Sequence, residues 1–356
     1  MDLPWPIPRG SGCSTTWQSR TPMTSHDKPR RACLLMLTYN QATLVRKSAA
    51  ACLAQECEPL DIVFSDDGSS DNTFEVLQDI AAGYRGPHRL TIRRNPKNLG
   101  IGEHFNVLIR ESRSDFFIAS AGDDVSVPTR AQGLINAWDR SQQKADLISS
   151  HCIRMHYDGT LGELKCTDKL DGISAADWLR HRPYIIGATH AFTRRLHEHF
   201  GPFNSDIVCE DQIMVFRAAC LGTAMTVDEA FVHYRDGGCS RQPALETEAE
   251  RQAWERKARR LDIIEMRQLL RDAETVGQGD LARKHLQEKL NRSTFLDELS
   301  AQSTFEDMLA VSRQHVGIAF LWRYKKVLTH YFREPYAVFR RKNQARKQFF
   351  KRLRKR

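Results

Sequence analysis

Residues 60–71 read LDIVFSDDGSSD, and this stretch decides the fold class. Its apolar first half predicts a short buried strand, which stops at a cluster of small polar residues that favour a turn. The same combination occurs upstream, where the apolar run 32–37 (ACLLML) ends in Thr38-Tyr39-Asn40. Both stretches therefore predict a buried strand that ends in a polar loop.

Further apolar runs alternate with stretches of helical spacing. The pattern predicts strands at 90–93, 115–120 and 147–155, and helices at 41–55, 73–82, 101–111 and 128–141. Strands that alternate with helices indicate a parallel α/β sheet with right-handed crossovers. From about Pro243 the pattern changes to charged helical segments at 246–275, 281–299 and 306–313. We therefore predict an α/β domain over 31–242, a helical region over 243–319 and a basic, aromatic helical tail over 320–356.

The composition is that of a folded protein. Hydrophobic residues make up 41% of the 356 residues and aromatic residues 9%, which excludes a largely disordered chain. No run reaches the roughly 18 consecutive apolar residues of a membrane-spanning helix. Residues 1–30 lack the apolar core of a secretory signal and predict a disordered arm, with Met23 as an alternative first residue. The nine cysteines form no C-x-x-C pair, which favours a reducing cytoplasm over a disulfide framework.

Positive charge is concentrated at the C-terminus. The chain has 53 Lys plus Arg and 44 Asp plus Glu, a net charge of +9. The segment 320–356 holds 14 basic residues and one acidic residue, or +13, so the rest of the chain is at 9 − 13 = −4. Basic and aromatic residues at helical spacing predict an element that lies on an anionic membrane surface. A solvated basic helix packed through its aromatic residues, and nucleic-acid binding, remain as alternatives.

Two pairs of carboxylates follow two of the predicted strands. Asp66 and Asp67 come after 60–64, and Asp123 and Asp124 come after 115–120. In open α/β sheets ligands bind beyond the carboxyl ends of the strands. Adjacent carboxylates repel one another, and paired hard oxygen ligands suit Mg²⁺ or Mn²⁺ held jointly with substrate phosphates. Taken singly, the first pair is equally consistent with a plain turn and the second with a helix N-cap.

Two later stretches add polar groups. Glu210 and Asp211 precede a segment of helical spacing, and alone they are typical of a helix start with a favourable dipole. Residues 231–240 (FVHYRDGGCS) combine a predicted strand with a glycine-rich loop. His233 alone is typical of a core histidine, whereas Arg235 and Ser240 could donate hydrogen bonds to a diphosphate.

In chain order these motifs resemble glycosyltransferase family 2, a large inverting family with the GT-A fold. The series is Thr38-Tyr39-Asn40, Asp66–Asp71, Asn98-Leu99-Gly100, Asp123-Asp124, Glu210-Asp211 and His233-Tyr234-Arg235 with Gly238 and Ser240. The resemblance covers about residues 31–242. It implies an α/β GT-A fold, a Rossmann-like, mostly parallel sheet flanked by helices, here followed by an all-helical C-terminal appendage. One departure is Leu37, where many relatives carry proline.

The resemblance implies roles for individual donor-side residues. Asp67 is expected to hydrogen-bond the nucleotide base with Asp66 close by, while the loop Asn98–Gly102 flanks the nucleotide. His233, Arg235 and Ser240 are expected to close over the diphosphate. The implied donor-binding set is Leu37, Thr38, Tyr39, Asn40, Asp66, Asp67, Gly68, Ser69, Asn98, Gly100, Gly102, Asp123, Arg235 and Ser240.

The resemblance also implies a metal site, a catalytic base and an acceptor side. The family's D-x-D element is shortened here to Gly122-Asp123-Asp124, so Asp124 is the expected direct ligand of Mn²⁺ or Mg²⁺ and Asp123 faces the sugar or ribose. The implied metal set is Asp124, Asp123 and His233. Asp211 matches the catalytic base, with Glu210 beside it. The acceptor side is expected at a strand containing Gly187, Ala188 and His190.

The implied activity is inverting transfer of a sugar from a nucleotide-diphosphate sugar, with UDP or dTDP favoured, to a hydroxyl of a glycan or lipid-linked acceptor. The expected setting is cell-surface polysaccharide or lipopolysaccharide synthesis, in the cytoplasm and peripherally on the inner face of the cytoplasmic membrane. Two alternatives stay open. One is a non-catalytic relative that binds nucleotide sugars, and the other is a polyanion- or membrane-binding protein that acts through its basic tail.

Overall fold

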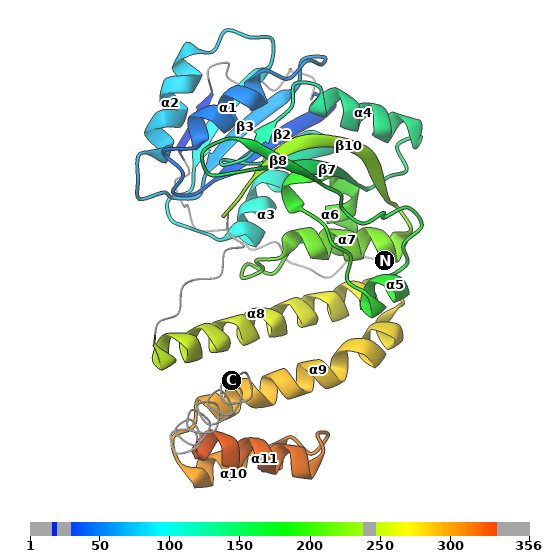
Figure 1. The fold of residues 1–356 in the computed structure, drawn as a ribbon. Coiled ribbons are helices and arrows are strands. Elements are labelled where there is room, and N and C mark those ends of the chain that lie inside the picture. The colour runs from blue at the N-terminus through cyan, green and yellow to red at the C-terminus, as the bar shows by residue number, and fades with distance from the viewer. Residues whose placement is uncertain (1–15, 20–29, 238–246, 333–356) are drawn as a thin grey trace, which may run out of the picture. The chain divides into compact units, whose positions relative to one another are not determined.

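The computed structural model describes residues 16–19, 30–237 and 247–332 (Figure 1). The chain divides into two compact units. The first comprises Met1–Pro243 with Arg271–Gln278, and the second comprises Ala244–Leu270 with Gly279–Arg356.

A ten-stranded mixed sheet forms the centre of the first unit, in the order β1-β4-β3-β2-β5-β9-β7-β10-β6, with β8 paired to β7. Its parallel strands are β2 (Ala32–Thr38), β3 (Asp61–Asp66), β4 (Arg89–Arg94), β5 (Phe116–Ala121), β7 (Leu147–Met155) and β10 (Ala224–Arg235). The strands paired antiparallel are β1 (Thr16–Ser19), β6 (Val125–Ser126), β8 (Leu161–Lys165) and β9 (Ala191–Thr193). The predicted, mostly parallel α/β sheet is therefore confirmed, with short antiparallel strands added at its edges and between β5 and β7.

Helices cover both faces of this sheet (Figure 1). On one face lie α1 (Val45–Leu53), α2 (Thr73–Gly83) and α4 (Arg130–Arg140), and on the other lie α3 (Ile101–Glu111), α6 (Arg194–Phe200) and α7 (Glu210–Leu221). The remaining short elements are α5 (Ala175–Arg180) and the 3₁₀ helix η1 (Gly187–Thr189). The main core forms where α1, α2 and α4 bury apolar side chains against the strands, among them Leu34, Ile62, Phe64 and Ile118.

Near the N-terminus of this unit the sequence prediction differs from the structure at two places. Helix α1 begins at Val45 rather than at Gln41, and the main-chain N–H groups of Gln41 and Ala42 donate to the side chains of Thr73 and Asp71. The predicted arm over 1–30 contains strand β1, which pairs antiparallel with β4.

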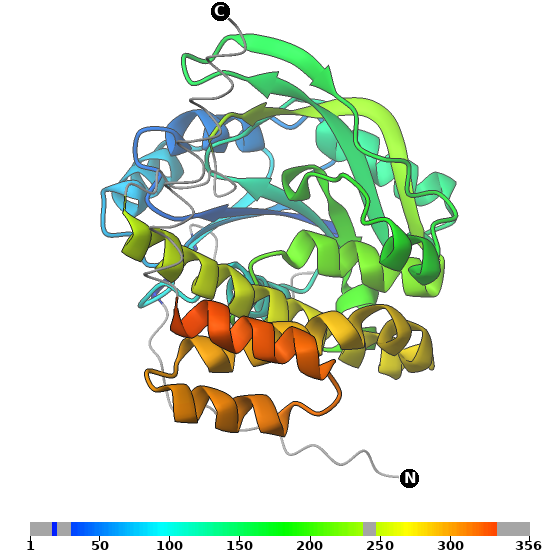
Figure 2. The ribbon, with the colours of Figure 1, turned by 60° about the horizontal axis from the view of Figure 1, so that its bottom comes forward.

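The second unit is helical, as the sequence predicted (Figure 2). It contains most of α8 (Glu248–Thr275), with α9 (Gly279–Ser300), α10 (Phe305–Gln314) and α11 (Phe320–Tyr331). Its core joins α9, α10 and α11 through Phe295, Leu299, Met308 and Val327. Among the helices that the structure describes, none has the length and apolar character to cross a bilayer.

The last turn of α8 belongs to the first unit. Asp272 forms an ion pair with Arg217 of α7 at 2.7 Å, and both side chains are buried. Gln278 donates to the carbonyl oxygen of Cys220 at 3.0 Å. The sequence placed the change of architecture near Pro243, but residues 271–278 return to the α/β unit through these polar contacts.

Candidate functional site

Three of the predicted motifs meet at one edge of the sheet. Strand β2 lies between β3 and β5 and runs parallel to both, with Thr38 opposite Asp66 and Leu37 opposite Ala121. The N–H of Asp67 donates to the carbonyl of Thr38 at 2.9 Å, and the N–H of Gly122 donates to that of Leu37 at 3.0 Å. The segments 38–40, 66–71 and 122–124 therefore lie side by side at the carboxyl ends of the strands, where open α/β sheets bind ligands.

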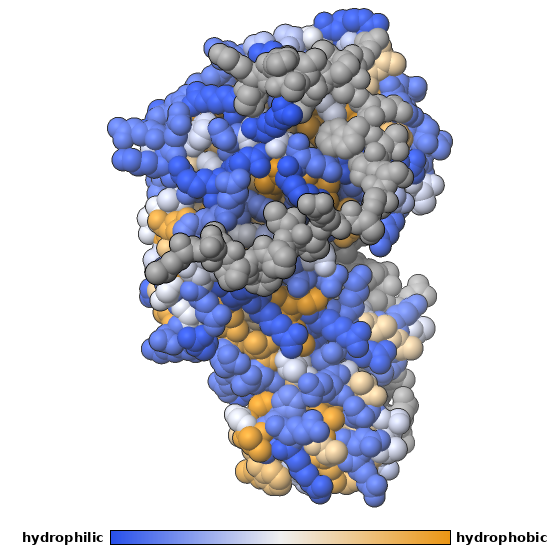
Figure 3. All heavy atoms as spheres, turned by 180° about the vertical axis from the view of Figure 1, so that it is seen from behind, coloured by the Kyte–Doolittle hydropathy of each residue, from blue (hydrophilic) through white to orange (hydrophobic). Residues whose placement is uncertain are grey.

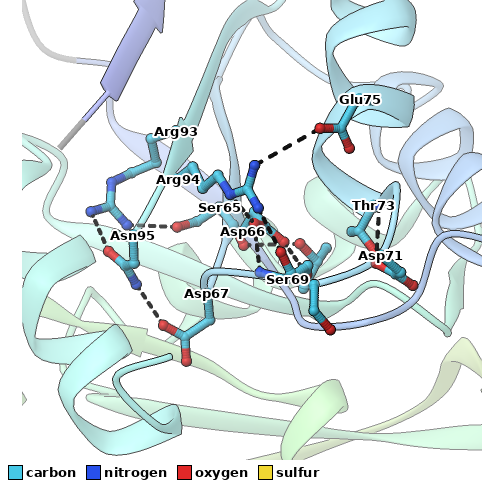
Figure 4. Close-up of polar contacts among 12 residues, drawn as sticks. Ser65, Asp66, Asp67, Ser69, Asp71, Thr73, Glu75, Arg93, Arg94 and Asn95 are labelled. Carbon is cyan, nitrogen blue, oxygen red and sulfur yellow. Dashed lines mark hydrogen bonds and ion pairs between the residues drawn. The ribbon is translucent and has the colours of Figure 1, made fainter. Parts of the chain in front are cut away.

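The loop 66–71 is held closed by its own carboxylates (Figure 4). Asp66 accepts hydrogen bonds from the N–H and the hydroxyl of Ser69 and pairs with Arg94 at 3.2 Å. Asp71 accepts from the N–H and the hydroxyl of Thr73 at the start of α2. Burial raises the pKa of Asp66, while the bonds from Ser69 and the Arg94 charge lower it. Both carboxylates are thus used to shape the loop.

Gly68 sits where this loop touches the next one. Its φ is +71°, in the left-handed region that favours glycine, and a Cβ there would lie 2.6 Å from the carbonyl carbon of Lys97. No other residue fits that position without moving the backbone. The glycine therefore brings the loop 66–71 against the loop 95–100, which carries the Asn98-Leu99-Gly100 motif.

Asp67 fastens these two loops together. Its Oδ1 accepts from the Asn95 side-chain amide at 2.7 Å and from the Leu99 N–H at 3.0 Å, and its Oδ2 accepts from the Gly100 N–H at 3.0 Å. A carboxylate offers about four acceptor positions, so one remains on Oδ2. The structure therefore gives Asp67 a positioning role that the sequence did not predict, and the predicted contact with a base stays a proposal.

A buried arginine stands behind Asp67. Arg93 donates to the Asn95 side-chain oxygen at 2.7 Å and to the Ser65 hydroxyl at 2.7 Å (Figure 4). The side-chain oxygen of Asn95 thus faces Arg93 and its NH₂ group faces Asp67, so a single orientation of the amide forms hydrogen bonds with both residues. Sequence reasoning missed Arg93 and Asn95; the available signal was an arginine at the end of the predicted strand 90–93.

Asp124 is buried at the second strand end, and its Oδ1 accepts the main-chain N–H of Arg235 at 2.8 Å. Burial and then the neighbouring charge of Asp123 raise the pKa of Asp124 to about 8. The charges of Arg130 and Arg235 act in the opposite direction. The carboxylate is therefore in a position where a nearby cation would stabilise its charged form.

Arg130 is a buried cation next to this carboxylate pair. Its guanidinium donates to the Ser126 hydroxyl at 2.9 Å and to the carbonyls of Ala119 at 2.6 Å and Ala188 at 2.7 Å. Burial lowers the pKa of Arg130 to about 10, so it stays charged near neutral pH. It ties β5 and β6, which flank the carboxylates, to the predicted acceptor-side segment.

The carboxylate pair fits a divalent metal in donor type. Asp123 and Asp124 supply hard oxygen atoms, which Mg²⁺ and Mn²⁺ prefer. In the described residues, no three His, Cys, Asp or Glu side chains gather to hold an ion by themselves. An ion here would take most of its ligands from water and phosphate, as Mg²⁺ commonly does. His233, the third predicted ligand, lies half-buried on β10 opposite Val125.

Arg235 makes main-chain contacts that the sequence did not predict, and its predicted contact with a diphosphate stays a proposal. Its Nε donates to the carbonyl of Asp123 at 3.0 Å and its Nη1 to that of Tyr157 at 3.3 Å, and the side chain is buried. These bonds use main-chain acceptors and hold the carboxylate loop against β7 and β10. Ser240, predicted beside it on the diphosphate, lies outside the described residues.

The predicted acceptor-side strand is wrong in its conformation. Residues 187–189 form the 3₁₀ turn η1, since the N–H groups of Thr189 and His190 donate to Ile186 and Gly187 at 2.9 and 3.0 Å. The strand, β9, starts at Ala191. His190 is buried, neither ring nitrogen has a hydrogen-bond partner, and burial followed by the Arg130 charge lowers its pKa to about 3. It is therefore a neutral core residue in this structure.

The acid pair begins helix α7 and contacts η1. The Oδ1 of Asp211 accepts from the Gln212 N–H at 2.7 Å, and a Cβ on Gly187 would lie 2.9 Å from the Cβ of Asp211. Burial raises the pKa of Asp211, and burial with the Asp211 charge raises that of Glu210 well above its usual value. A carboxylate with a raised pKa is a better proton acceptor.

The sheet order defines an α/β protein, and its carboxylates lie at the carboxyl ends of the strands, where open α/β sheets bind ligands. Part of this α/β unit is similar to known proteins. A family model described as glycosyl transferase family 2 matches residues 33–160. An uncharacterized protein of Mycobacterium tuberculosis is 24% identical over 127 residues, 35% of this chain and 36% of that protein. An uncharacterized glycosyltransferase of Rickettsia felis is 26% identical over 131 residues, 35% of this chain and 21% of its own.

Solved structures agree on the fold. TarS of S. aureus in complex with UDP superposes with a TM-score of 0.52 at 14% identity, covering 85% of this chain and 89% of that one. The mannosyltransferase PcManGT of Pyrobaculum calidifontis in complex with GDP-Man and Mn²⁺ gives 0.50 at 14% identity, with 85% of each chain covered. The match to the family 2 glycosyltransferase model therefore extends over residues 33–160, and the predicted GT-A fold with a C-terminal helical region is confirmed. The curated relatives match this chain over about a third of their own length or less.

Proposed function

We propose that this chain is a metal-dependent, inverting glycosyltransferase that moves a sugar from a nucleotide-diphosphate sugar to an acceptor hydroxyl. The observation that carries the proposal is the meeting of Asp67 and the Asp123-Asp124 pair at one edge of a family 2 domain. A non-catalytic nucleotide-sugar-binding relative would not need the acid pair at α7, which is present here.

On the donor side, the free acceptor position of Asp67 is proposed to take an N–H of the base. The segment Leu37–Asn40 and the loop 98–102 would flank the base and ribose. TarS was solved with UDP and PcManGT with GDP-Man, which supports a nucleotide-diphosphate donor as a class. Uracil and thymine each offer an N3–H that an acidic side chain can accept, which is compatible with this contact. UDP or dTDP sugars are therefore the proposed donors.

Asp124, with Asp123 beside it, is proposed to hold Mn²⁺ or Mg²⁺. When bound, the ion supplies Lewis-acid stabilisation of negative charge on the departing diphosphate. The chain's own contribution is to fix the carboxylates: the Arg235 N–H orients Asp124, and Arg130 partly offsets its charge from within the core. His233 is proposed to lie near the same diphosphate.

Asp211 is proposed to be the general base that takes the proton from the acceptor hydroxyl. Attack opposite the leaving group inverts the anomeric centre in a single displacement, so no covalent nucleophile is needed. Burial raises the pKa of Asp211, and burial with the Asp211 charge raises the pKa of Glu210. Gly187 lets Asp211 lie directly against η1, the proposed acceptor side.

The acceptor is proposed to be a glycan or a lipid-linked sugar of the cell envelope, in polysaccharide or lipopolysaccharide synthesis. The supporting feature is the segment 320–356, with 14 basic residues and one acidic residue. Such a segment is attracted to anionic lipid, which would bring a cytoplasmic enzyme to the inner face of the membrane. The residues after Phe332 lie outside the described part of the chain.

Calorimetric titration with UDP, dTDP, GDP and CMP, each with and without Mn²⁺, tests the donor site. One diphosphate is expected to bind more tightly with Mn²⁺ than without it, and Asp124→Ala is expected to remove that metal-dependent gain. Asp115→Ala, an exposed carboxylate at the opposite end of β5, is the matched control and should keep it. If no nucleotide binds at any metal concentration, the proposed function is wrong.

Gly187→Ala is expected to lower kcat by up to about 100-fold, because the added Cβ displaces the Asp211 side chain and misplacement of a reacting group by about 1 Å costs that much. A Cβ at Gly187 would lie 2.9 Å from Asp211, so one of the two residues must move. Gly83→Ala, where a Cβ meets nothing within 4 Å, is the matched control. Steady-state turnover and nucleotide affinity, measured together, separate a shifted base from a damaged donor site.

A further inference from the structure

Helix α11 carries large apolar side chains on its outer side as well as on its inner side. Phe320 and Leu321 are 65% and 81% exposed, and Val316, in the turn that precedes the helix, is 80% exposed. Tyr324, one turn further on, is 39% exposed, and its ring stacks on that of Phe320 at 6.0 Å. We call these four side chains the 316–324 surface.

The inner side of α11 is already occupied, so the helix cannot turn the 316–324 surface inward. Val327 is fully buried in the core shared with α9 and α10. Trp322 packs on Phe295 at 5.9 Å, and Arg292 and Lys326 lie over its ring at 5.3 and 5.4 Å. The orientation of the helix is thus fixed by contacts within the second unit.

Single exposed apolar residues are ordinary, but a gathering of them indicates an interaction surface. Here four large ones fall within residues 316–324. Figure 3 shows apolar side chains among hydrophilic ones over the C-terminal helices. The 316–324 surface is therefore expected to bury its apolar side chains in an apolar part of a partner.

The charge around this surface indicates what that partner is. Arg313 and Lys325, which lie on either side of it in the sequence, are exposed, and the segment 320–356 has a net charge of +13. The partner is therefore both anionic and apolar. Nucleic acid offers phosphates but no apolar interior for Val316 and Leu321, whereas an anionic bilayer offers a charged headgroup layer above acyl chains. The lipid surface fits both properties.

We propose that the 316–324 surface inserts into the headgroup boundary of an anionic bilayer, with the basic segment that begins at α11 providing the long-range attraction. Insertion into the bilayer would hold the enzyme beside a lipid-linked acceptor, and only this purpose of the insertion rests on the proposed function. Apolar insertion and charge attraction are separate contributions, so each can be removed without the other.

Vesicle sedimentation of the full chain tests the proposal. The vesicles are phosphatidylcholine alone, or phosphatidylcholine mixed with phosphatidylglycerol, at low and high salt. The wild type is expected to bind the anionic vesicles and to lose binding as salt screens the charges. Phe320→Ser/Leu321→Ser is expected to weaken binding at low salt by roughly tenfold or more, because two exposed apolar side chains no longer enter the lipid. Leu161→Ser/Leu164→Ser removes two exposed leucines from β8 and should bind like the wild type.

Three results would overturn the proposal. The first is equal vesicle affinity of the wild type and the Phe320/Leu321 variant, and the second is no binding of the wild type to any vesicle. The third is a wild type that is a dimer in light scattering and a variant that is a monomer, which would make the surface a contact between copies. Nucleotide titration of the same variant is expected to be unchanged. Vesicle binding without nucleotide binding in the wild type would contradict the proposed function and leave this inference standing.

Discussion

Asp211→Asn is expected to lower kcat by about 10²–10⁴-fold, the usual contribution of a general base, while leaving nucleotide affinity unchanged. The amide keeps the shape of the side chain, including the oxygen that accepts the Gln212 N–H, but it cannot take a proton. Steady-state turnover, read beside calorimetric titration with the nucleotide, measures the two effects separately. Asp206→Asn, an exposed aspartate five residues upstream, is the matched control and should retain full activity.

The pH dependence provides a second readout of the same group. Burial raises the pKa of Asp211, so its carboxylate becomes protonated at a higher pH than an ordinary aspartate. A general base works only when it is deprotonated. The activity is therefore expected to fall as the pH drops through this raised pKa, with Glu210 sharing the titration. Full activity of Asp211→Asn, or a rate with no acidic limb, would show that another group takes the proton.

Asp272→Ala is expected to lower the free energy of unfolding by about 3–5 kcal/mol, because it leaves the Arg217 guanidinium buried without its carboxylate. Two hydrogen bonds join the pair, at 2.7 and 3.2 Å, and both side chains are buried. Arg217 also donates to the carbonyl of Gly201 and lies over the Phe203 ring at 4.7 Å. Denaturant unfolding monitored by circular dichroism measures the loss.

An exposed ion pair in the second unit is the matched control. Lys289 contacts Asp262 at 2.6 Å, with Lys289 largely exposed, so Asp262→Ala should cost no more than about 1 kcal/mol. The double variant Arg217→Met/Asp272→Leu removes both buried charges and is expected to recover much of the loss. Equal destabilisation by Asp272→Ala and Asp262→Ala would mean that the buried pair does not secure the end of α8 to α7.

The regular elements were predictable because their signals are local. The strand predicted at 147–155 coincides with β7, and the helix predicted at 101–111 coincides with α3. An apolar run bounded by polar residues and an apolar period near 3.6 are both visible within about ten residues. The order of the motifs was equally accessible, since it is read directly from the sequence and several motifs lie at strand ends that the same pattern defines.

The remaining features depend on contacts between distant parts of the chain. The turn at Gly187 exists because main-chain groups of 186–190 bond among themselves, and its importance comes from Asp211, which is 24 positions away in the sequence. The chain of bonds from Arg93 through Asn95 to Asp67 likewise joins two strands and a loop. Asp272, far beyond the predicted domain boundary, completes a pair with Arg217. The hydrophobic pattern of one short stretch holds no information about such contacts between distant residues.

The bonds from Asp67 to the Leu99 and Gly100 amides have a consequence for how a ligand is received. When a loop orders only on binding, the lost conformational entropy reduces the binding free energy by about 1–2 kcal/mol per ordered residue. Here the loop is already fastened from beneath by a buried carboxylate, which an arginine and an asparagine in turn hold in place. The cost of ordering was met when the protein folded. The loop is therefore preorganised, and a ligand that binds at this edge loses little binding free energy to ordering it.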